Sequence, residues 1–174
     1  MKNLISAWLD QLIVAACDGG ASTRKTWIVI DELSGLGEIP ALLTGVTELR
    51  KTGFRVVVGM QDFHQLRHIY GPNRAETLLN NLSNKVILRA NSAEIAERQS
   101  RLLGEVKQLV TSTSRTRSAH NRNDGGGSVT TSYQESRERI VTPEDLTSLP
   151  DLTAYVKFSG DDTVRQTTIR PYQG

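Results

Sequence analysis

Short runs of consecutive apolar residues alternate with amphipathic stretches along the first half of the chain. The run Thr26–Ile30 is rich in β-branched residues and shows no polar alternation, which is typical of a strand buried on both faces of a parallel sheet. Residues 54–60 form a second apolar run, and between the two runs a helical pattern begins at Pro40 and closes at Gly53. Strand, helix and strand in this order predict a βαβ unit with parallel pairing and a right-handed crossover.

Periodic patterns continue on both sides of this unit. Residues 1–16 carry apolar residues in pairs four apart, as in an amphipathic helix packed on a core. The sequence predicts further helices at residues 63–70, 75–82 and 91–103, and further strands at residues 85–88, 154–158 and 164–169. Asn91 and Glu94 resemble a capping box, and Gly160 begins a turn typical of an antiparallel hairpin. Together these elements predict an α/β fold with a mostly parallel sheet, flanking helices and a carboxyl-terminal antiparallel hairpin.

Apolar residues nearly vanish between residues 111 and 132, where Ser, Thr, Arg, Asn and Gly dominate. Such a segment buries too little apolar surface to offset the entropy lost on ordering, so we expect a mobile basic loop. Its Arg115, Arg117 and Arg122 are candidates for nonspecific, salt-dependent contacts with DNA phosphates. The alternative interpretation is a solvent-exposed surface loop with no role in binding.

Composition excludes some classes of protein but does not by itself indicate a function. The chain has 174 residues, 37% of them hydrophobic and 23% charged, which suits one soluble globular domain. A net charge of +2 does not by itself indicate a nucleic-acid-binding protein, and no apolar stretch approaches the ~20 residues that span a bilayer. Cys17 is the single cysteine, which excludes an intrachain disulfide. We expect Trp8 and Trp27 in the core.

Two adjacent carboxylates, Asp31 and Glu32, follow the first strand. The carboxyl edge of a parallel sheet is where open α/β proteins bind ligands. In P-loop nucleotide hydrolases an acid at this point holds Mg²⁺, directly or through water, and a following Glu can orient the attacking water. Gln61 follows the neighbouring strand, so we expect it at the same edge of the sheet. A polar cap at the end of a strand is the alternative interpretation of this acid pair.

The glycine loop that cradles phosphate in such enzymes is not found in these 174 residues. The nearest approach to G-x-x-x-x-G-K-[ST] is residues 19–26, which carry Arg24 in place of the second glycine and precede a strand instead of following one. A bulky residue there keeps backbone N–H groups from closing around phosphate. We therefore expect either no nucleotide hydrolase, or the later part of one whose phosphate loop lies upstream and whose isolated fragment is inactive.

Matching blocks of sequence, in the same order, resemble the type IV secretion coupling proteins of the TraD/TrwB type. The blocks are residues 27–33 (WIVIDEL), 48–53 (ELRKTG), 56–61 (VVVGMQ), 69–71 (IYG) and 149–156 (LPDLTAYV). The resemblance implies a RecA-like, FtsK-like motor domain, with residues 1–174 as its carboxyl-terminal part without the Walker A loop. The implied whole is a hexameric, membrane-anchored ATPase that delivers relaxase-bound DNA to the type IV secretion channel in conjugative plasmid transfer. Such a motor works on the cytoplasmic side of the bacterial inner membrane, and this fragment alone is expected to be soluble and cytoplasmic.

The same resemblance implies roles for single residues, with ATP and Mg²⁺ as cofactors. Asp31 matches the Walker B acid that coordinates Mg²⁺, and Glu32 matches the carboxylate that activates water. Gln61 matches the polar residue that senses the γ-phosphate. Arg50 matches an arginine that reaches the nucleotide of a neighbouring subunit, a contribution worth ~10³–10⁵ in rate where it operates. Its alternative role is to complement the dipole at a helix end.

Two other functions stay open. The chain could be a noncatalytic interaction module, or a remnant of a coupling protein, that joins coupling-protein rings or binds secretion components. It could also be a metal-dependent nuclease that uses Asp31 and Glu32. Two-metal sites need further converging carboxylates, and the nearby acids Glu38, Glu48 and Asp62 are not obviously placed to supply them.

Overall fold

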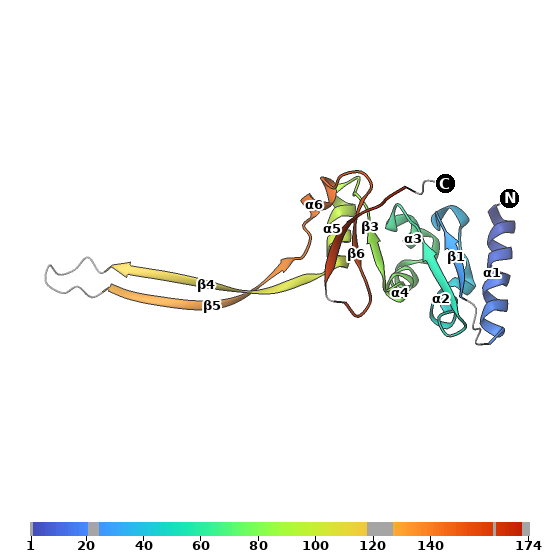
Figure 1. Cartoon of the computed structure of the whole chain (residues 1–174), viewed down its shortest axis with the longest axis horizontal. Helices are drawn as coiled ribbons and strands as arrows, with labels where there is room; N and C mark the ends of the chain where they lie inside the picture. The colour runs from blue at the N-terminus through green and yellow to red at the C-terminus, as the bar shows by residue number, and fades with distance from the viewer. Residues whose placement is uncertain (1, 21–24, 118–126, 162, 172–174) are drawn as a thin grey trace. The chain divides into compact units, whose positions relative to one another are not determined.

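A computed structural model of the chain describes residues 2–20, 25–117, 127–161 and 163–171 (Figure 1). The chain divides into two compact units, Met1–Asn84 and Lys85–Gly174, which we call the first and the second unit. Each unit has a hydrophobic core of its own. The candidate nucleotide residues all fall in the first unit.

The first unit is built around one parallel strand pair. Its elements are α1 (Lys2–Asp18), β1 (Thr26–Ile30), the 3-10 helix η1 (Ser34–Leu36), α2 (Pro40–Glu48), β2 (Phe54–Val58), α3 (Phe63–Tyr70) and α4 (Pro72–Asn81). Strands β1 and β2 pair in parallel register from Thr26 opposite Phe54 to Ile30 opposite Val58. The predicted βαβ unit is therefore confirmed, with α2 as its crossover helix.

Helices α1 and α2 are joined by a hydrogen bond at the start of α2 and by a close approach at Gly45. The first turn of α2 has no side-chain cap of its own, and Asp10 of α1 accepts a hydrogen bond from the Ala41 N–H at 2.7 Å. Gly45 of α2 leaves room for Ile13 of α1, since a Cβ added at Gly45 would lie 2.5 Å from the Ile13 Cγ2 atom. Ile13 and Leu42 are buried to 1% and 0% exposure in the resulting core.

Burial of β1 is one-sided, and the expectation of a strand covered on both faces is wrong for the described chain. Ile28 and Ile30 are 7% and 5% exposed, whereas Trp27 and Val29 are 63% and 68% exposed. The reason is that the helices of this unit contribute to a single core, which Ile28 and Ile30 join from one face of the sheet. Trp8 of α1 is also exposed, so the prediction that both tryptophans lie in the core is wrong.

The second unit contains only antiparallel pairings among its described strands. Its elements are β3 (Lys85–Ile87), α5 (Ala93–Leu103), β4 (Glu105–Arg117), β5 (Gly127–Arg139), α6 (Pro143–Thr147), β6 (Thr153–Lys157) and β7 (Val164–Thr168). One sheet has the order β3-β6-β7, which confirms the predicted carboxyl-terminal hairpin. Because β3 also runs antiparallel to β6, the described pairing is mixed rather than mostly parallel.

The start of α5 corrects a detail of the predicted cap. Ser92, not Asn91, is the N-cap residue, and its hydroxyl accepts a hydrogen bond from the Ile95 N–H at 3.3 Å. Ser92 has the extended backbone that an N-cap needs, with φ −148° and ψ 157°. The helix then ends at Gly104, whose φ of +107° suits glycine.

Strands β4 and β5 form a long two-stranded ribbon that extends away from α5 (Figure 1). Their register runs from Glu105 opposite Arg139 to Arg117 opposite Gly127. The expected loop at residues 111–132 is therefore wrong for residues 111–117 and 127–132, which are strand; residues 118–126 lie outside the described part. Thr and Ser side chains suit an exposed strand, and the ladder satisfies the backbone N–H and C=O groups without an apolar core.

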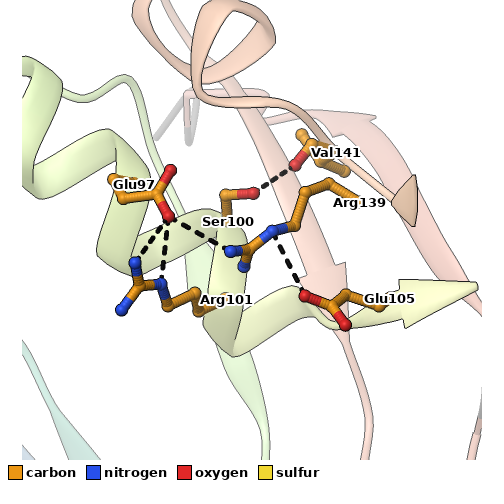
Figure 2. Close-up of polar contacts among 6 residues, drawn as sticks. All are labelled: Glu97, Ser100, Arg101, Glu105, Arg139 and Val141. Carbon is orange, nitrogen blue, oxygen red and sulfur yellow. Dashed lines mark hydrogen bonds and ion pairs between the residues drawn. The ribbon is translucent and has the colours of Figure 1, made fainter. Parts of the chain in front are cut away.

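The root of this ribbon is tied to α5 by polar contacts. Arg139 of β5 donates to the Glu97 carboxylate of α5 at 3.1 Å and pairs with Glu105 of β4 at 3.4 Å (Figure 2). Close to them, the fully buried Ser100 hydroxyl donates to the Val141 carbonyl at 2.6 Å. Both strands and the helix are thus joined at one place.

Candidate functional site

The acid pair lies where the chain leaves β1, and backbone hydrogen bonds hold this exit against the end of β2. The Gly59 N–H donates to the Ile30 carbonyl at 2.7 Å, and the Leu33 N–H donates to the Gly59 carbonyl at 3.0 Å. These two bonds bracket Asp31 and Glu32. The backbone of the acid pair is therefore fixed by the neighbouring strand rather than by a free loop.

Gly59 makes this contact possible. A Cβ added at Gly59 would lie 2.1 Å from the Asp31 carbonyl oxygen and 3.0 Å from its carbonyl carbon, so only glycine fits. Sequence reasoning assigned no role to Gly59. The available signal was a glycine directly after the apolar run of β2, which often marks a close approach of two backbones.

Glu32 and Gln61 line the same open hollow, as expected from the parallel pairing of β1 and β2. This hollow has a volume of about 360 Å³, and its walls are formed by Glu32, Ser34, Gly35, Gln61 and Gln65. Asp31 precedes Glu32 and is exposed at the end of the strand. A carboxylate, a hydroxyl and two amides give the hollow a hydrogen-bonding lining that suits a polar ligand or water.

Ser34 holds the Glu32 side chain. Both the Ser34 hydroxyl and the Ser34 N–H donate to the same Glu32 oxygen, Oε1, the latter at 3.3 Å. Sequence reasoning missed both Ser34 and Gln65. Ser34 stands two residues after Glu32, a spacing common in local side-chain-to-backbone bonds, while Gln65 is visible only once α3 is placed.

The block I-Y-G, residues 69–71, supports the chain segment that follows the acid pair. The buried Tyr70 hydroxyl accepts a hydrogen bond from the Ile39 N–H at 3.0 Å, in the segment that joins η1 to α2. Burial raises the pKa of Tyr70 above its usual value, while the bond from Ile39 acts in the opposite direction. The neutral hydroxyl is thus the form that the fold favours.

Arg50 does not approach the hollow within the chain. It follows α2 and precedes β2, so the parallel topology puts it at the opposite end of β2 from Gln61. The adjacent Lys51 pairs with Glu48 at 2.8 Å on the surface. Within one chain, Arg50 therefore lies away from Glu32 and Gln61.

Two of the three candidate DNA-binding arginines belong to the outer part of the ribbon. The backbones of Arg115 and Arg117 lie in β4, opposite Val129 and Gly127 of β5. Arg122 lies outside the described residues. A strand ladder, rather than a loop, thus carries two of the three positions.

The acids nearest in sequence to Asp31 and Glu32 bear on the nuclease hypothesis. Within the described part of the chain, no group of three or more His, Cys, Asp and Glu residues is arranged to hold a metal ion. The acids nearest in sequence have local partners: Glu38 pairs with Arg74 at 2.6 Å, Glu48 with Lys51 at 2.8 Å, and Asp62 accepts from the His64 N–H at 2.8 Å as the cap of α3. Asp31 and Glu32 alone do not make a two-metal site.

Comparison with known proteins points to one family. The family model described as "Type IV secretion-system coupling protein DNA-binding domain" matches residues 1–169. Coupling protein TraD of Escherichia coli (strain K12) is 34% identical over 161 residues, which are 92% of this chain and 22% of that protein. None of the helices in the described residues has the length and apolar character needed to cross a membrane.

Solved structures of the bacterial conjugative coupling protein TrwB share the fold. The unbound TrwBdeltaN70 structure superposes with a TM-score of 0.81 at 31% identity, covering 99% of this chain and 38% of that chain. TrwB in complex with a non-hydrolysable ATP analogue gives 0.79 at 31% identity, covering 98% and 37%. The complex with ADP and Mg²⁺ gives 0.79 at the same identity, covering 98% and 36%. The chain thus spans well under half of each of these relatives.

Proposed function

Because the chain belongs to the type IV secretion-system coupling proteins, we propose that it is the later part of a RecA-like motor domain that hydrolyses ATP to move DNA during conjugation. The observation that carries this proposal is the meeting of Glu32 and Gln61 at one hollow beside the exit of β1. Similarity to TrwB, which has been solved with an ATP analogue and with ADP and Mg²⁺, supports a nucleotide as the ligand. In the proposed assembly the motor is a hexamer on the cytoplasmic side of the inner membrane, with the relaxase and the secretion channel as partners.

Three residues share the proposed chemistry at this edge. Glu32 accepts a hydrogen bond from the water that attacks the γ-phosphate, and Gln61 senses that phosphate from the neighbouring strand. Asp31 binds Mg²⁺. A single exposed carboxylate fits this ion, because Mg²⁺ is usually held by one or two carboxylates together with waters and substrate phosphates rather than by a protein cage. When bound, the ion neutralises charge on the phosphates.

The phosphate-cradling loop is proposed to come from sequence outside these 174 residues. A chain that carries Glu32 and Gln61 without a G-x-x-x-x-G-K-[ST] loop is expected to bind ATP poorly and to show no turnover. ATP hydrolysis by the purified 174-residue chain at the rate of the longer protein would contradict the proposal that the phosphate-cradling loop comes from outside these residues.

A Glu32→Gln substitution in the longer protein tests the function itself. The substitution removes the acceptor for the attacking water but keeps the shape of the side chain. We expect ATP hydrolysis to fall at least a hundredfold while the ATP analogue still binds. Glu48→Gln is the matched control, because Glu48 pairs with Lys51 on the surface away from the hollow. Hydrolysis that persists in Glu32→Gln would remove Glu32 from the mechanism.

An interaction module is the second candidate, and the exposed apolar side chains of β1 favour it. Trp27 and Val29 are 63% and 68% exposed on one face of a sheet, where apolar side chains commonly mark a contact with other protein. In this case the chain would associate with a longer coupling protein without contributing to hydrolysis. Co-purification with that protein, compared between the native chain and a Trp27→Ser, Val29→Ser variant, tests the idea; equal recovery would argue against it.

A further inference from the structure

We propose that Ser34 is a positioning residue that aims the Glu32 carboxylate into the hollow before nucleotide arrives. This inference rests on the proposed role of Glu32. It assigns to Ser34 a part in hydrolysis without adding a chemical step, since Ser34 acts only on the orientation of the Glu32 acceptor.

The first support is the two-point attachment of one carboxylate oxygen. The Ser34 hydroxyl and the Ser34 N–H both donate to Glu32 Oε1. Within the described residues the other oxygen, Oε2, has no hydrogen-bond partner, so it is the atom left to accept from water. A free Glu side chain loses rotamer entropy when it is ordered. Ser34 imposes that order in the unliganded fold.

The second support is that Ser34 itself sits on a fixed frame. Leu33, just before it, is 0% exposed and donates its N–H to the Gly59 carbonyl at 3.0 Å. The Leu36 N–H closes the turn by donating to the Leu33 carbonyl at 3.1 Å. The Leu36 carbonyl in turn accepts a hydrogen bond from the Ser6 hydroxyl of α1. The backbone around Ser34 is therefore held by Gly59, just after β2, on one side and by α1 on the other.

A simple helix cap explains only half of the contact. The η1 turn needs an acceptor for the Ser34 N–H, and Glu32 Oε1 supplies one. The hydroxyl adds a second donor to the same oxygen, which the cap does not require. Since Ser34 and Glu32 both line the hollow with Gln61, the extra bond bears on a side chain that faces the proposed ligand. A pure cap affects folding stability, whereas an aiming contact affects the rate of hydrolysis.

The test compares Ser34→Ala with Ser34→Thr in the longer, nucleotide-binding protein. Alanine removes the hydroxyl donor and keeps the N–H, while threonine restores the donor. We expect Ser34→Ala to lower kcat for ATP about tenfold with KM changed less than about twofold, and Ser34→Thr to recover at least half of the native kcat. Ser83→Ala, at an exposed position, is the matched control and leaves both constants unchanged. Thermal unfolding of each variant is measured alongside.

The outcomes separate this inference from the function on which it rests. An unchanged or raised kcat in Ser34→Ala, with hydrolysis abolished in Glu32→Gln, would overturn the role of Ser34 and leave the function standing. A fall in melting temperature that matches the fall in kcat and is not repaired by threonine would reduce the Ser34–Glu32 contact to a structural one. Full hydrolysis by Glu32→Gln would overturn both.

Discussion

Gly59 touches the backbone of Asp31 so closely that no side chain fits between them: a Cβ at Gly59 would lie 2.1 Å from the Asp31 carbonyl oxygen. The contact joins the ends of β1 and β2, the two strands from which Glu32 and Gln61 extend. Whatever moves these backbones apart also changes the hollow between the two side chains.

A Gly59→Ala substitution should therefore damage both stability and the site. Forcing a methyl group into this gap costs roughly 1–3 kcal/mol of unfolding free energy, because backbone atoms on both sides have to shift. We expect a matching drop in the denaturant midpoint and, in the longer protein, a loss of ATP hydrolysis. Gly19→Ala is the control, since a Cβ there meets the Ala15 carbonyl at an ordinary 3.4 Å. Equal denaturant midpoints for Gly59→Ala and Gly19→Ala would show that β1 and β2 can move apart without a loss of stability.

Tyr70 should make the stability of the chain sensitive to alkaline pH. Burial raises the pKa of Tyr70, so above the ordinary tyrosine pKa of about 10 the unfolded chain loses this proton first. Its contribution to stability is complete below that pH and is lost as the pH rises through the pKa of the folded state. We expect Tyr70→Phe to cost about 1 kcal/mol at neutral pH, because the Ile39 N–H loses its acceptor.

The measurement is denaturant unfolding of both proteins between pH 7 and 11. The difference in unfolding free energy between the native chain and Tyr70→Phe should shrink across the alkaline part of this range. Tyr133→Phe serves as the control, because Tyr133 is 74% exposed on the ribbon and should give no such difference. A pH-independent gap between the native chain and Tyr70→Phe would contradict the role of burial.

Arg139 and Arg101 contact the same oxygen of Glu97, but only Arg139 connects helix and ribbon. Arg101 is in an exposed pair within α5, worth about 0.3–0.5 kcal/mol. The Arg139 side chain is 25% exposed and also pairs with Glu105, so its removal should cost more, roughly 1–2 kcal/mol. Arg139→Gln and Arg101→Gln are compared by unfolding and by amide hydrogen exchange at the start of β4. Faster exchange in both variants alike would contradict the anchoring role.

The three candidate arginines between residues 111 and 132 should set the salt dependence of the proposed DNA binding. Replacing Arg115, Arg117 and Arg122 by Ala should weaken binding equally for unrelated DNA sequences. The slope of log K against log salt concentration should become shallower by roughly 0.7–0.9 for each DNA phosphate that the protein no longer neutralises. Replacing Arg74 and Arg165, which pair with carboxylates elsewhere, is the control and should leave the slope unchanged. If both sets of arginine variants give the same salt-dependence slope, the DNA-binding surface lies elsewhere on the protein.

If the proposed hexameric ring forms, mixing two variants of the longer protein can decide whether Arg50 serves a neighbouring subunit. Arg50→Ala subunits keep Glu32, and Glu32→Gln subunits keep Arg50, so each variant alone should be inactive. If Arg50 reaches across the interface, mixing the two variants of the longer protein restores part of the ATP hydrolysis, because some sites then combine an intact Glu32 with an intact Arg50. No recovery on mixing would assign Arg50 to its own chain or to the structural role of a helix end.

The first unit was predictable because its signals are local and strong. The apolar run of β1, the proline that begins α2 and the glycine that ends the I-Y-G block each act over a few residues, and the structure has strands and helices there. The meeting of Glu32 and Gln61 followed from parallel pairing alone. Ser34 was not predictable, since its bond to Glu32 depends on side-chain directions that the periodicity of apolar residues does not encode.

The failures have physical causes as well. The exposure of Trp27 depends on which surfaces are present to cover it, and composition does not reveal them. The ribbon contradicts the expected loop because its ladder of backbone hydrogen bonds needs no apolar core, and the absence of apolar residues was the signal used. The cap of α5 was wrong by one residue, the usual uncertainty of an element boundary.

The ribbon also gives the second unit a mechanical property. Thirteen residues in each of β4 and β5, rising about 3.3 Å per residue, span roughly 40 Å from the Arg139 anchor to the last described pair. With such a lever, a turn of α5 by about 10° moves the far end by about 7 Å, as long as the ribbon stays straight. The far end of a straight ribbon would therefore move much farther than the helix to which its root is tied.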